Sequence, residues 1–170
     1  PEQEQGLMRG FQLWVNLPAR DKMGAPKYQE FSAELIPVVT PHEGVGIKVI
    51  AGRVGDVLGP VQQPATDPTY LDVTLAANAA FEHPVPAGHS AFAYVYEGEI
   101  AVDAAVIGKG ELLVFGPGDA VRFKGLAERS KFIVVAGRPI GEPVAHYGPF
   151  VMNTQAEIMQ AVQDYQAGLF

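Results

Sequence analysis

The chain has 170 residues, 48% of them hydrophobic, and its 12 basic and 19 acidic side chains give it a net charge of −7. This length suits one domain with extensions and a sizeable core. Cysteine is absent, which excludes disulfides and thiolate metal sites from the chain. The basic residues are scattered, so we expect no direct binding to nucleic acid. We also expect no membrane segment, because no apolar run reaches about 20 residues. The polar start PEQEQG does not look like a signal peptide, which predicts a cytoplasmic location.

Short runs rich in Val, Ile, Phe and Tyr alternate with turns, and 19 Gly and 14 Pro punctuate the chain. This pattern predicts an all-β sandwich or barrel. The expected strands span residues 11–17, 46–51, 70–75, 91–96, 105–107, 111–115, 120–124 and 131–136. In the third of these, Leu71, Val73 and Leu75 share one face, as in a half-buried strand. The segments 18–26 and 56–68 contain several Pro and Gly residues and are expected to be loops.

The end of the chain changes from a strand pattern to a helix pattern. Thr154 followed by Glu157 forms a capping box, and Gly168 stands where a helix would stop. The apolar residues between these signals recur at helical spacing and share one face: Ile158, Ala161, Val162 and Tyr165. We predict one amphipathic helix over 154–167 that packs on the barrel through this face.

The residues that could carry chemistry include all four histidines of the chain: His42, His83, His89 and His146. His83 and His89 are six residues apart and could form a displaced metal pair or an acid/base pair. The alternative, which we favour from the sequence, is that both are loop histidines beside prolines. Glu97 and Glu99 could also do acid/base work, but Gly98 between them is typical of a tight, exposed hairpin.

Signatures of hydrolytic or phosphate chemistry are missing from the sequence. Ser32, Ser90 and Ser130 lie outside any Gly-x-Ser-x-Gly elbow. The glycine-rich segment 116–120 has no following Lys-Ser/Thr, so it reads as a barrel turn rather than a phosphate loop. We therefore expect no catalytic residue in this chain.

Three sequence blocks bracket the chain. They are GFQLWVNLP at 10–18, followed by Lys22, Met23, Pro26, Tyr28 and Gln29; GPFVMNT at 148–154; and DYQAG at 164–168. Together they resemble the pirin family of two-domain cupin proteins, over essentially all of the chain. The resemblance implies an all-β, cupin-type double-stranded β-helix barrel with a C-terminal α-helix. Its expected parts are a linker and N-terminal strand at 1–40, the barrel at 41–153 and the helix at 154–170.

The resemblance also implies where a metal would be. Family members hold a metal, usually iron, through three histidines and a glutamate in an N-terminal barrel. The second ligand motif typically stands just before the segment that begins this chain. We therefore expect the chain to be the C-terminal half of a bicupin, without a cofactor of its own, and the N-terminal metal-binding domain to be absent from it.

The second barrel has its own counterparts of the two cupin ligand motifs. They are PVPAGHSAFAYVYEGE at 84–99 and GELLVFGPGDAVRFKG at 110–125. Counting back from the turn at Gly98 places the histidine positions of the first motif on Pro84 and Pro86. The ligand positions of the second motif fall on Phe123 and Gly125. None of these four side chains can bind a cation, so the resemblance implies vacant ligand positions and no metal in this chain.

Two functions from different classes follow from the resemblance. The chain could support a metal-containing domain in a full-length protein with quercetin 2,3-dioxygenase activity. Alternatively, it could be a non-enzymatic regulatory module that binds other proteins, like the transcription cofactors of the family. A third alternative is a small-ligand binder that uses the empty barrel.

The expected partner is the N-terminal cupin domain, a second copy of the chain, or another protein. Phe11, Leu13 and Trp14 lie close together in an expected strand, and strand alternation places at least one of them on each side. We expect an apolar contact surface there. Core packing is the alternative, and the one we favour, for Phe11, Trp14 and Tyr28.

Overall fold

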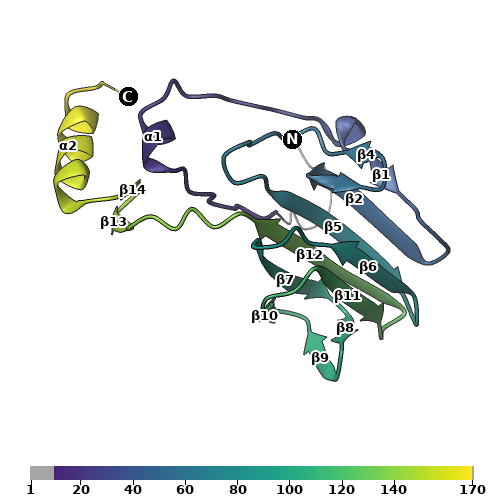
Figure 1. Cartoon of the computed structure of the whole chain (residues 1–170). Coiled ribbons are helices and arrows are strands. Elements are labelled where there is room, and N and C mark those ends of the chain that lie inside the picture. Colours follow the sequence, from purple (N-terminus) through teal and green to yellow (C-terminus); the bar gives the residue numbers. More distant parts are fainter. Residues whose placement is uncertain (1–9, 170) are drawn as a thin grey trace. The chain divides into compact units, whose positions relative to one another are not determined.

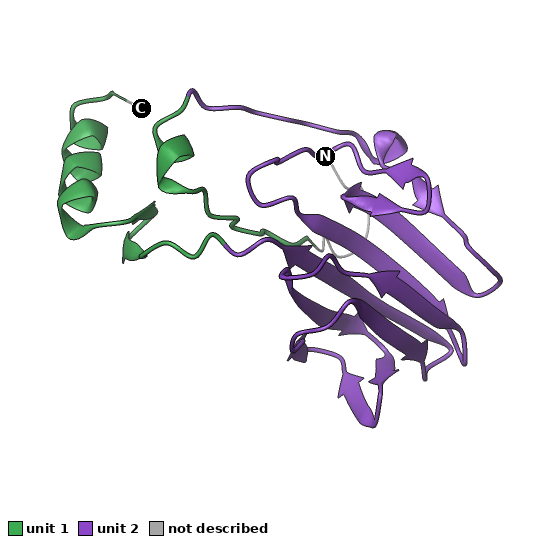
Figure 2. Cartoon of the chain, viewed as in Figure 1, with its two compact units in different colours: residues 1–24, 140–170 green, residues 25–139 purple. Residues whose placement is uncertain are grey.

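The computed structural model describes residues 10–169 of the chain. It divides into two compact units, one made of Pro1–Gly24 with Ile140–Phe170 and the other of Ala25–Pro139 (Figure 2). Residues 25–40 therefore belong to the same unit as the strands of the barrel. Residues 140–153 belong to the unit of the C-terminal helix. None of the helices in the described part of the chain is long and apolar enough to cross a membrane.

The unit Ala25–Pro139 consists of two main antiparallel sheets (Figure 1). The six-stranded sheet has the order β1 (Val38–Val39), β2 (Val45–Ala51), β5 (Thr69–Ala76), β12 (Arg129–Gly137), β7 (Ser90–Glu97) and β10 (Leu112–Val114). The four-stranded sheet has the order β6 (Ala80–Pro84), β11 (Ala120–Gly125), β8 (Glu99–Val102) and β9 (Ala105–Gly108). A short 3-10 helix (Ala33–Leu35) and the small hairpin of β3 (Arg53–Val54) and β4 (Val57–Leu58) complete this unit.

The core of this unit is built by strands that bury every second residue. In β5 the burial alternates over the whole strand, and Leu71, Val73 and Leu75 are fully buried, as the sequence predicts. Phe123 of β11 packs against Phe132 of β12, with ring centroids 4.7 Å apart, and so joins the two sheets. Such an aromatic pair contributes about 0.5–1.5 kcal/mol beyond the area it buries.

The turn at Gly98 is not the exposed hairpin that the sequence indicates. Strand β7 ends at Glu97 in the six-stranded sheet, and β8 begins at Glu99 in the four-stranded sheet. The chain therefore crosses between sheets at this residue. Gly98 has a φ of +68°, and a Cβ atom here would overlap the carbonyl oxygen of Arg129. Glycine is required for this crossing because the backbone is both left-handed and closely packed.

Seven of the eight expected strands are present, with bounds shifted by one or two residues. The expected strand at 11–17 is wrong, because residues 10–18, all described, form neither helix nor strand. Two strands of the four-stranded sheet, β6 and β8, were not expected. Strand β6 has the sequence AFEHP, whose charged residue and proline are typical of a loop. Strand β8 has only four residues, too few for a periodic signal.

The other unit combines segments from both ends of the chain: α1 (Ala19–Lys22), β13 (Ala145–Tyr147), β14 (Phe150–Met152) and α2 (Gln155–Gln166). Lys22 donates a hydrogen bond from Nζ to the carbonyl oxygen of Val151 at 2.9 Å. The carboxylate of Glu142 accepts bonds from the backbone N–H of Ala19 at 2.7 Å and from Nδ2 of Asn153 at 2.8 Å. These charge-assisted bonds tie the two chain segments together.

The C-terminal helix begins with the predicted capping box. Oγ1 of Thr154 accepts a hydrogen bond from the backbone N–H of Glu157 at 3.2 Å, and the Glu157 carboxylate accepts one from the backbone N–H of Thr154 at 2.7 Å. The helix packs on β13 and β14 and buries Ile158 and Ala161. The expectation that Tyr165 is also buried is wrong. Its side chain is 66% exposed, although its ring meets the edge of Phe150 at the border of the contact.

We predict that replacing Ile158 by Asp destabilises the helix-containing unit by about 2–5 kcal/mol, because the change loses burial and places a charge in an apolar contact. Hydrogen exchange of the α2 amide protons measures this local free energy of unfolding. Met159→Asp is the matched control, since the Met159 side chain on the same helix is 60% exposed. Equal exchange rates in the two variants would refute the packing of Ile158.

Candidate functional site

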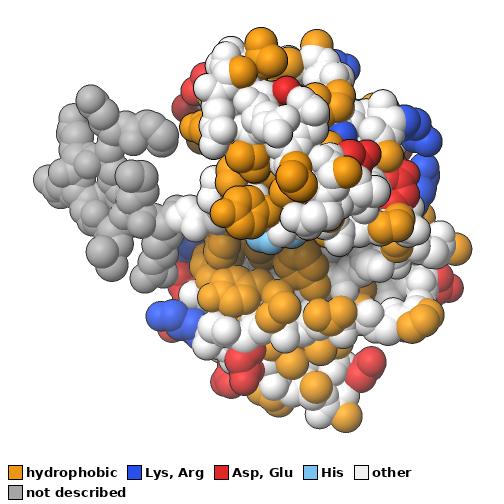
Figure 3. Space-filling model, turned by 90° about the vertical axis from the view of Figure 1, so that its left-hand side faces the viewer, with side chains coloured by type: hydrophobic (Ala, Val, Ile, Leu, Met, Phe, Trp, Pro, Cys, Tyr) orange, Lys and Arg blue, Asp and Glu red, His pale blue; other side chains and the backbone are white. Residues whose placement is uncertain are grey.

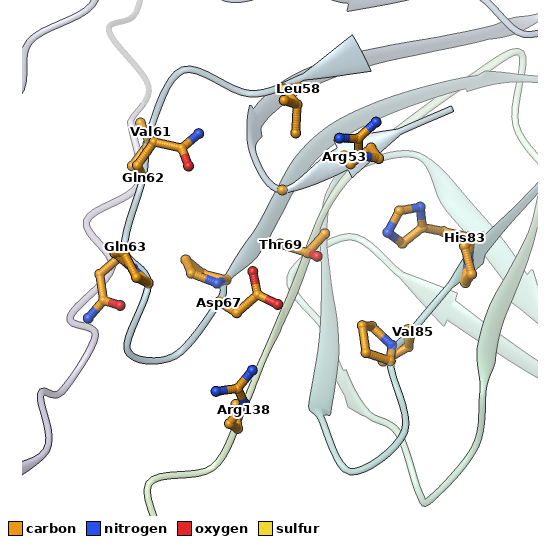
Figure 4. A pocket seen from close by; sticks show the side chains of 15 residues that line it. Arg53, Leu58, Val61, Gln62, Gln63, Asp67, Thr69, His83, Val85 and Arg138 are labelled. Atoms are coloured by element: carbon orange, nitrogen blue, oxygen red, sulfur yellow. The ribbon is translucent and has the colours of Figure 1, made fainter. Parts of the chain in front are cut away.

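A cavity of about 640 Å³ opens in the unit Ala25–Pro139. Its walls come from three separate stretches: the loop-rich segment 52–69, the end of β6 with the residues after it, and the residue that follows β12. Figure 4 shows the side chains that line it. The polar ones are Arg53, Gln62, Gln63, Asp67, Thr69, His83 and Arg138, and the apolar ones include Leu58, Val61 and Val85.

His83 forms part of the cavity wall. In β6 the burial alternates, so Phe81 and His83 face inward, whereas Glu82 faces outward and pairs with Arg122 of β11 at 2.7 Å. His83 is only 4% exposed, and the centroid of its ring lies 6.0 Å from that of the Phe81 ring. In Figure 4 the imidazole points from β6 toward the cavity.

The imidazole of His83 has no hydrogen-bond partner among residues 10–169. Burial lowers its pKa because the surroundings disfavour the charged form. A neutral imidazole offers one donor and one acceptor nitrogen, both of which remain available to a bound molecule.

The expected ligand positions are only partly on the inner face of the barrel. Phe123 and Gly125 are buried on the inward side of β11, but Pro84 and Pro86 are exposed. The buried residues at this end of β6 are His83 and Val85. The assignment of the ligand positions to Pro84, Pro86, Phe123 and Gly125 stays a prediction. Residues 85–89, which follow β6, are not part of a strand.

The inward side chains do not fit a metal of the type that cupin barrels hold. His83 is one imidazole, and its inward neighbours are carbon side chains: Phe81, Val85, Val121 and Phe123. At Gly125 a Cβ atom would overlap the carbonyl oxygen of Ala76, which leaves no room for a longer side chain. Within the described part of the chain, no group of three or more His, Cys, Asp or Glu residues could surround a metal ion. A protein metal site usually needs at least three ligands.

Two arginines bring positive charge to the cavity. Arg53 lies on β3 and Arg138 directly follows β12, and neither forms an ion pair with another described residue. Arg138 is held by its backbone N–H, which donates to the carbonyl oxygen of Thr66 at 2.7 Å. Asp67 adds one negative charge and adopts a left-handed backbone with a φ of +46°. Arg53, Arg138 and Asp67 together give the cavity walls a charge of +1.

The other residues singled out from the sequence lie outside this cavity. Glu97 pairs with Arg129 at 2.6 Å, which leaves it poorly suited to acid/base work, and Ser130 donates to the carbonyl oxygen of Glu99 at 2.6 Å. His89 is in the loop after β6, as expected, with its Nδ1 atom buried and without a partner among the described residues. His42, His146, Ser32 and Ser90 are exposed.

The aromatic residues of the first sequence block are on the surface. Trp14 is 66% exposed, Phe11 is 42% exposed and Leu13 is half-buried, whereas Tyr28 in the barrel unit is 86% exposed. The favoured expectation of core packing is therefore wrong for Trp14 and Tyr28. A contact surface formed by Phe11, Leu13 and Trp14 stays a prediction.

Comparison with known proteins identifies the family of the chain. Residues 70–170 match the family model described as the pirin C-terminal cupin domain. The chain belongs to the pirin family. A pirin-like protein of Caulobacter vibrioides is 47% identical over 171 residues, covering 100% of this chain and 62% of that protein. Mouse pirin is 41% identical over 162 residues, covering 92% of this chain and 55% of that protein.

A solved structure titled quercetin 2,3-dioxygenase from Acinetobacter baumannii has the same fold, with a TM-score of 0.86 and 36% identity. The match covers 92% of this chain and 55% of that one. The all-β cupin barrel with a C-terminal helix is thereby confirmed. The chain spans about three fifths of the length of the first curated relatives that it matches.

The lowered pKa of His83 predicts a pH-dependent stability. Because the unfolded chain takes up a proton near the ordinary histidine pKa of about 6.5 and folded His83 does so only at lower pH, this stabilisation is present above about pH 6.5. It is lost as the pH falls from there toward the folded pKa, with a slope of at most about 1.4 kcal/mol per pH unit. Urea unfolding at a series of pH values is expected to give a shallower slope for His83→Gln than for the wild type.

The exposed residue His42 provides the matched control for this measurement. His42→Gln is expected to keep the wild-type slope. If His83→Gln and the wild type lose stability equally on acidification, the imidazole is not desolvated as described.

Proposed function

We propose that the chain is the metal-free C-terminal half of a pirin-type bicupin. In this role it supports an N-terminal cupin domain that holds the metal, in a full-length protein with quercetin 2,3-dioxygenase-type activity. The observation that carries the proposal is the inner face of β6 and β11, where Phe81, Val85, Val121 and Phe123 surround the single imidazole of His83.

Oxygenation of an aromatic substrate needs a metal or an organic cofactor to activate dioxygen or the substrate. The inward side chains of this barrel supply one nitrogen donor, which is too few to hold such a metal. The chemistry of the whole protein would therefore belong to the portion of the relatives that this chain does not match. The iron of the family is expected in that portion, bound by the family's histidines and glutamate.

The apolar interior suits a supporting role because its core is made of packed phenylalanine side chains. Phe123 lies within a cluster of three further phenylalanines, with ring centroids 6.4 Å from Phe81, 5.8 Å from Phe115 and 4.7 Å from Phe132. Burying a phenylalanine side chain contributes about 1.5–3 kcal/mol relative to leaving it exposed. A barrel packed in this way can hold a fixed shape against which a second domain docks.

A second candidate, a non-enzymatic module that binds other proteins, is favoured by the exposed apolar residues between 11 and 15. Phe11 is 42%, Trp14 66% and Val15 50% exposed. Hydrophobic side chains are also exposed elsewhere on the described residues (Figure 3). Exposed apolar patches often mark contact sites. The partner would be the N-terminal cupin domain, a second copy of the chain, or another protein.

The proposal predicts that the purified chain, supplied with iron, consumes no quercetin beyond an iron-only blank. The reason is that the inward side chains of the barrel offer one nitrogen donor, too few to hold iron where it could activate substrate or dioxygen. The loss of quercetin absorbance and the uptake of dioxygen measure the reaction, and a full-length pirin with its N-terminal domain is the positive control.

Turnover that requires the chain and survives a chelator would refute the supporting role. Sedimentation of the same preparation over a concentration series separates the two candidates. Capture of a separately produced N-terminal half favours the bicupin role. A chain that ignores this half but associates with itself favours the interaction module.

A further inference from the structure

We propose that the cavity beside His83 is a binding site for a small organic monocarboxylate with an apolar body, such as an aromatic acid. The site lies wholly within the unit Ala25–Pro139 and is made from residues of this chain. It requires no metal, and it would exist whether or not the full-length protein is an oxygenase.

The size and the walls of the cavity fit such a molecule. A volume of about 640 Å³ lies within the range of small-molecule sites, about 300–1,000 Å³. Leu58, Val61 and Val85 contribute aliphatic walls, and Pro64, Pro68, Pro84 and Pro86 contribute rigid ones. A mostly apolar lining with a few placed polar groups is typical of sites for compact organic ligands.

The charges of the cavity favour one negative charge on the ligand. Arg53 and Arg138 come from different elements and line the same cavity, and neither is neutralised by an ion pair with another described residue. A guanidinium group binds a carboxylate through two parallel hydrogen bonds. This positive charge stands out in a chain with a net charge of −7. Asp67 in the same wall disfavours a second negative charge on the ligand.

His83 is the buried polar group that points to a ligand. The residue is only 4% exposed, and its ring extends into the cavity in Figure 4. No described residue forms a hydrogen bond with the imidazole. Polar groups in folded proteins are nearly always paired with protein, water or a ligand, and a molecule bound in this cavity would lie against the imidazole of His83. A carboxyl or hydroxyl oxygen of the ligand would supply that partner.

Three different elements bring His83, Arg138 and Arg53 to the same cavity. The strand β6 sets His83 inward, the backbone bond to Thr66 holds Arg138 at the end of β12, and the β3–β4 hairpin carries Arg53. Gly52, next to Arg53, has a φ of +82°, and a Cβ atom there would meet Thr69 at 3.0 Å. The glycine therefore lets the Arg53 hairpin lie close against the wall that contains Thr69.

The test is a titration of the isotopically labelled 170-residue chain with benzoate, followed by NMR. Benzoate is expected to shift the His83 ring resonances and the amide resonances of residues 52–69 saturably. Benzamide, which has the same shape without the charge, and acetate, which lacks the apolar body, should each bind at least about tenfold more weakly.

Two single variants and one matched control locate the charge. Arg53→Gln and Arg138→Gln are each expected to weaken benzoate binding by about tenfold, since each removes one charge from the cavity. Arg122→Gln removes the same charge from the outer face of β11, where Arg122 pairs with Glu82. It should bind benzoate like the wild type. All three arginines are exposed, so the variants are expected to fold.

Four results would overturn the site. They are the absence of saturable shifts with benzoate, equal affinity for benzoate and benzamide, benzoate binding that neither Arg53→Gln nor Arg138→Gln weakens, and equal loss of binding in Arg122→Gln. A short peptide with an acidic C-terminal residue tests the other source of a carboxylate. Tighter binding of this peptide than of benzoate, with the same arginine dependence, would contradict a small-molecule ligand.

Discussion

The alternation of side chains along the paired strands β6 and β11 determines what the interior of this barrel can do. Register pairs Phe123 with Phe81 and Val121 with His83 on the inner face, and it pairs Arg122 with Glu82 on the outer face. Because alternate residues point to opposite faces, a slip of one residue would turn every one of these side chains over. The inner positions then decide between a metal centre, which needs several nitrogen or oxygen donors, and a packed core.

On β6 and β11 the inner positions give a packed core in which His83 is the one polar side chain. Phe123 contacts phenylalanines of both sheets, so the sheets are joined by aromatic packing in the region where a cupin metal site would need its ligands. The exception, His83, lies at the end of β6 where the wall opens into the cavity. The same register therefore accounts for both proposals. It gives an inner face packed with apolar side chains, as the proposed supporting role requires, and it leaves one imidazole at a cavity wall.

Much of the fold could be predicted from the sequence because its signals are local. The alternation in 70–75 and the capping box at Thr154 each depend on residues within one element, and both are confirmed in the structure. The first sequence block gives a wrong prediction, because its alternating apolar residues are typical of a strand. Residues 11–17 pair with no strand among the described residues. The sequence also predicts burial of Tyr165, which is exposed, because helical periodicity alone does not show how far the partner surface extends.

The candidate site could not be found in this way, because its parts are distant in the sequence. Arg53, Asp67 and Arg138 are isolated charged residues in a hairpin, a loop and a strand end, and no spacing rule connects them. The sequence predicts a loop at His83, because the proline beside it is not typical of a strand such as β6. Only the pairing of β6 with β11 reveals that this histidine points inward.

The central claim, that the inner face of this barrel is a packed core and not a metal centre, is tested most directly by elemental analysis. The chain is purified without chelator, exposed to iron, nickel and zinc, and passed through a desalting column. We expect well under one equivalent of any of these metals per chain, and no difference between the wild type and His83→Gln. One equivalent of metal per chain that is lost in His83→Gln would contradict the account.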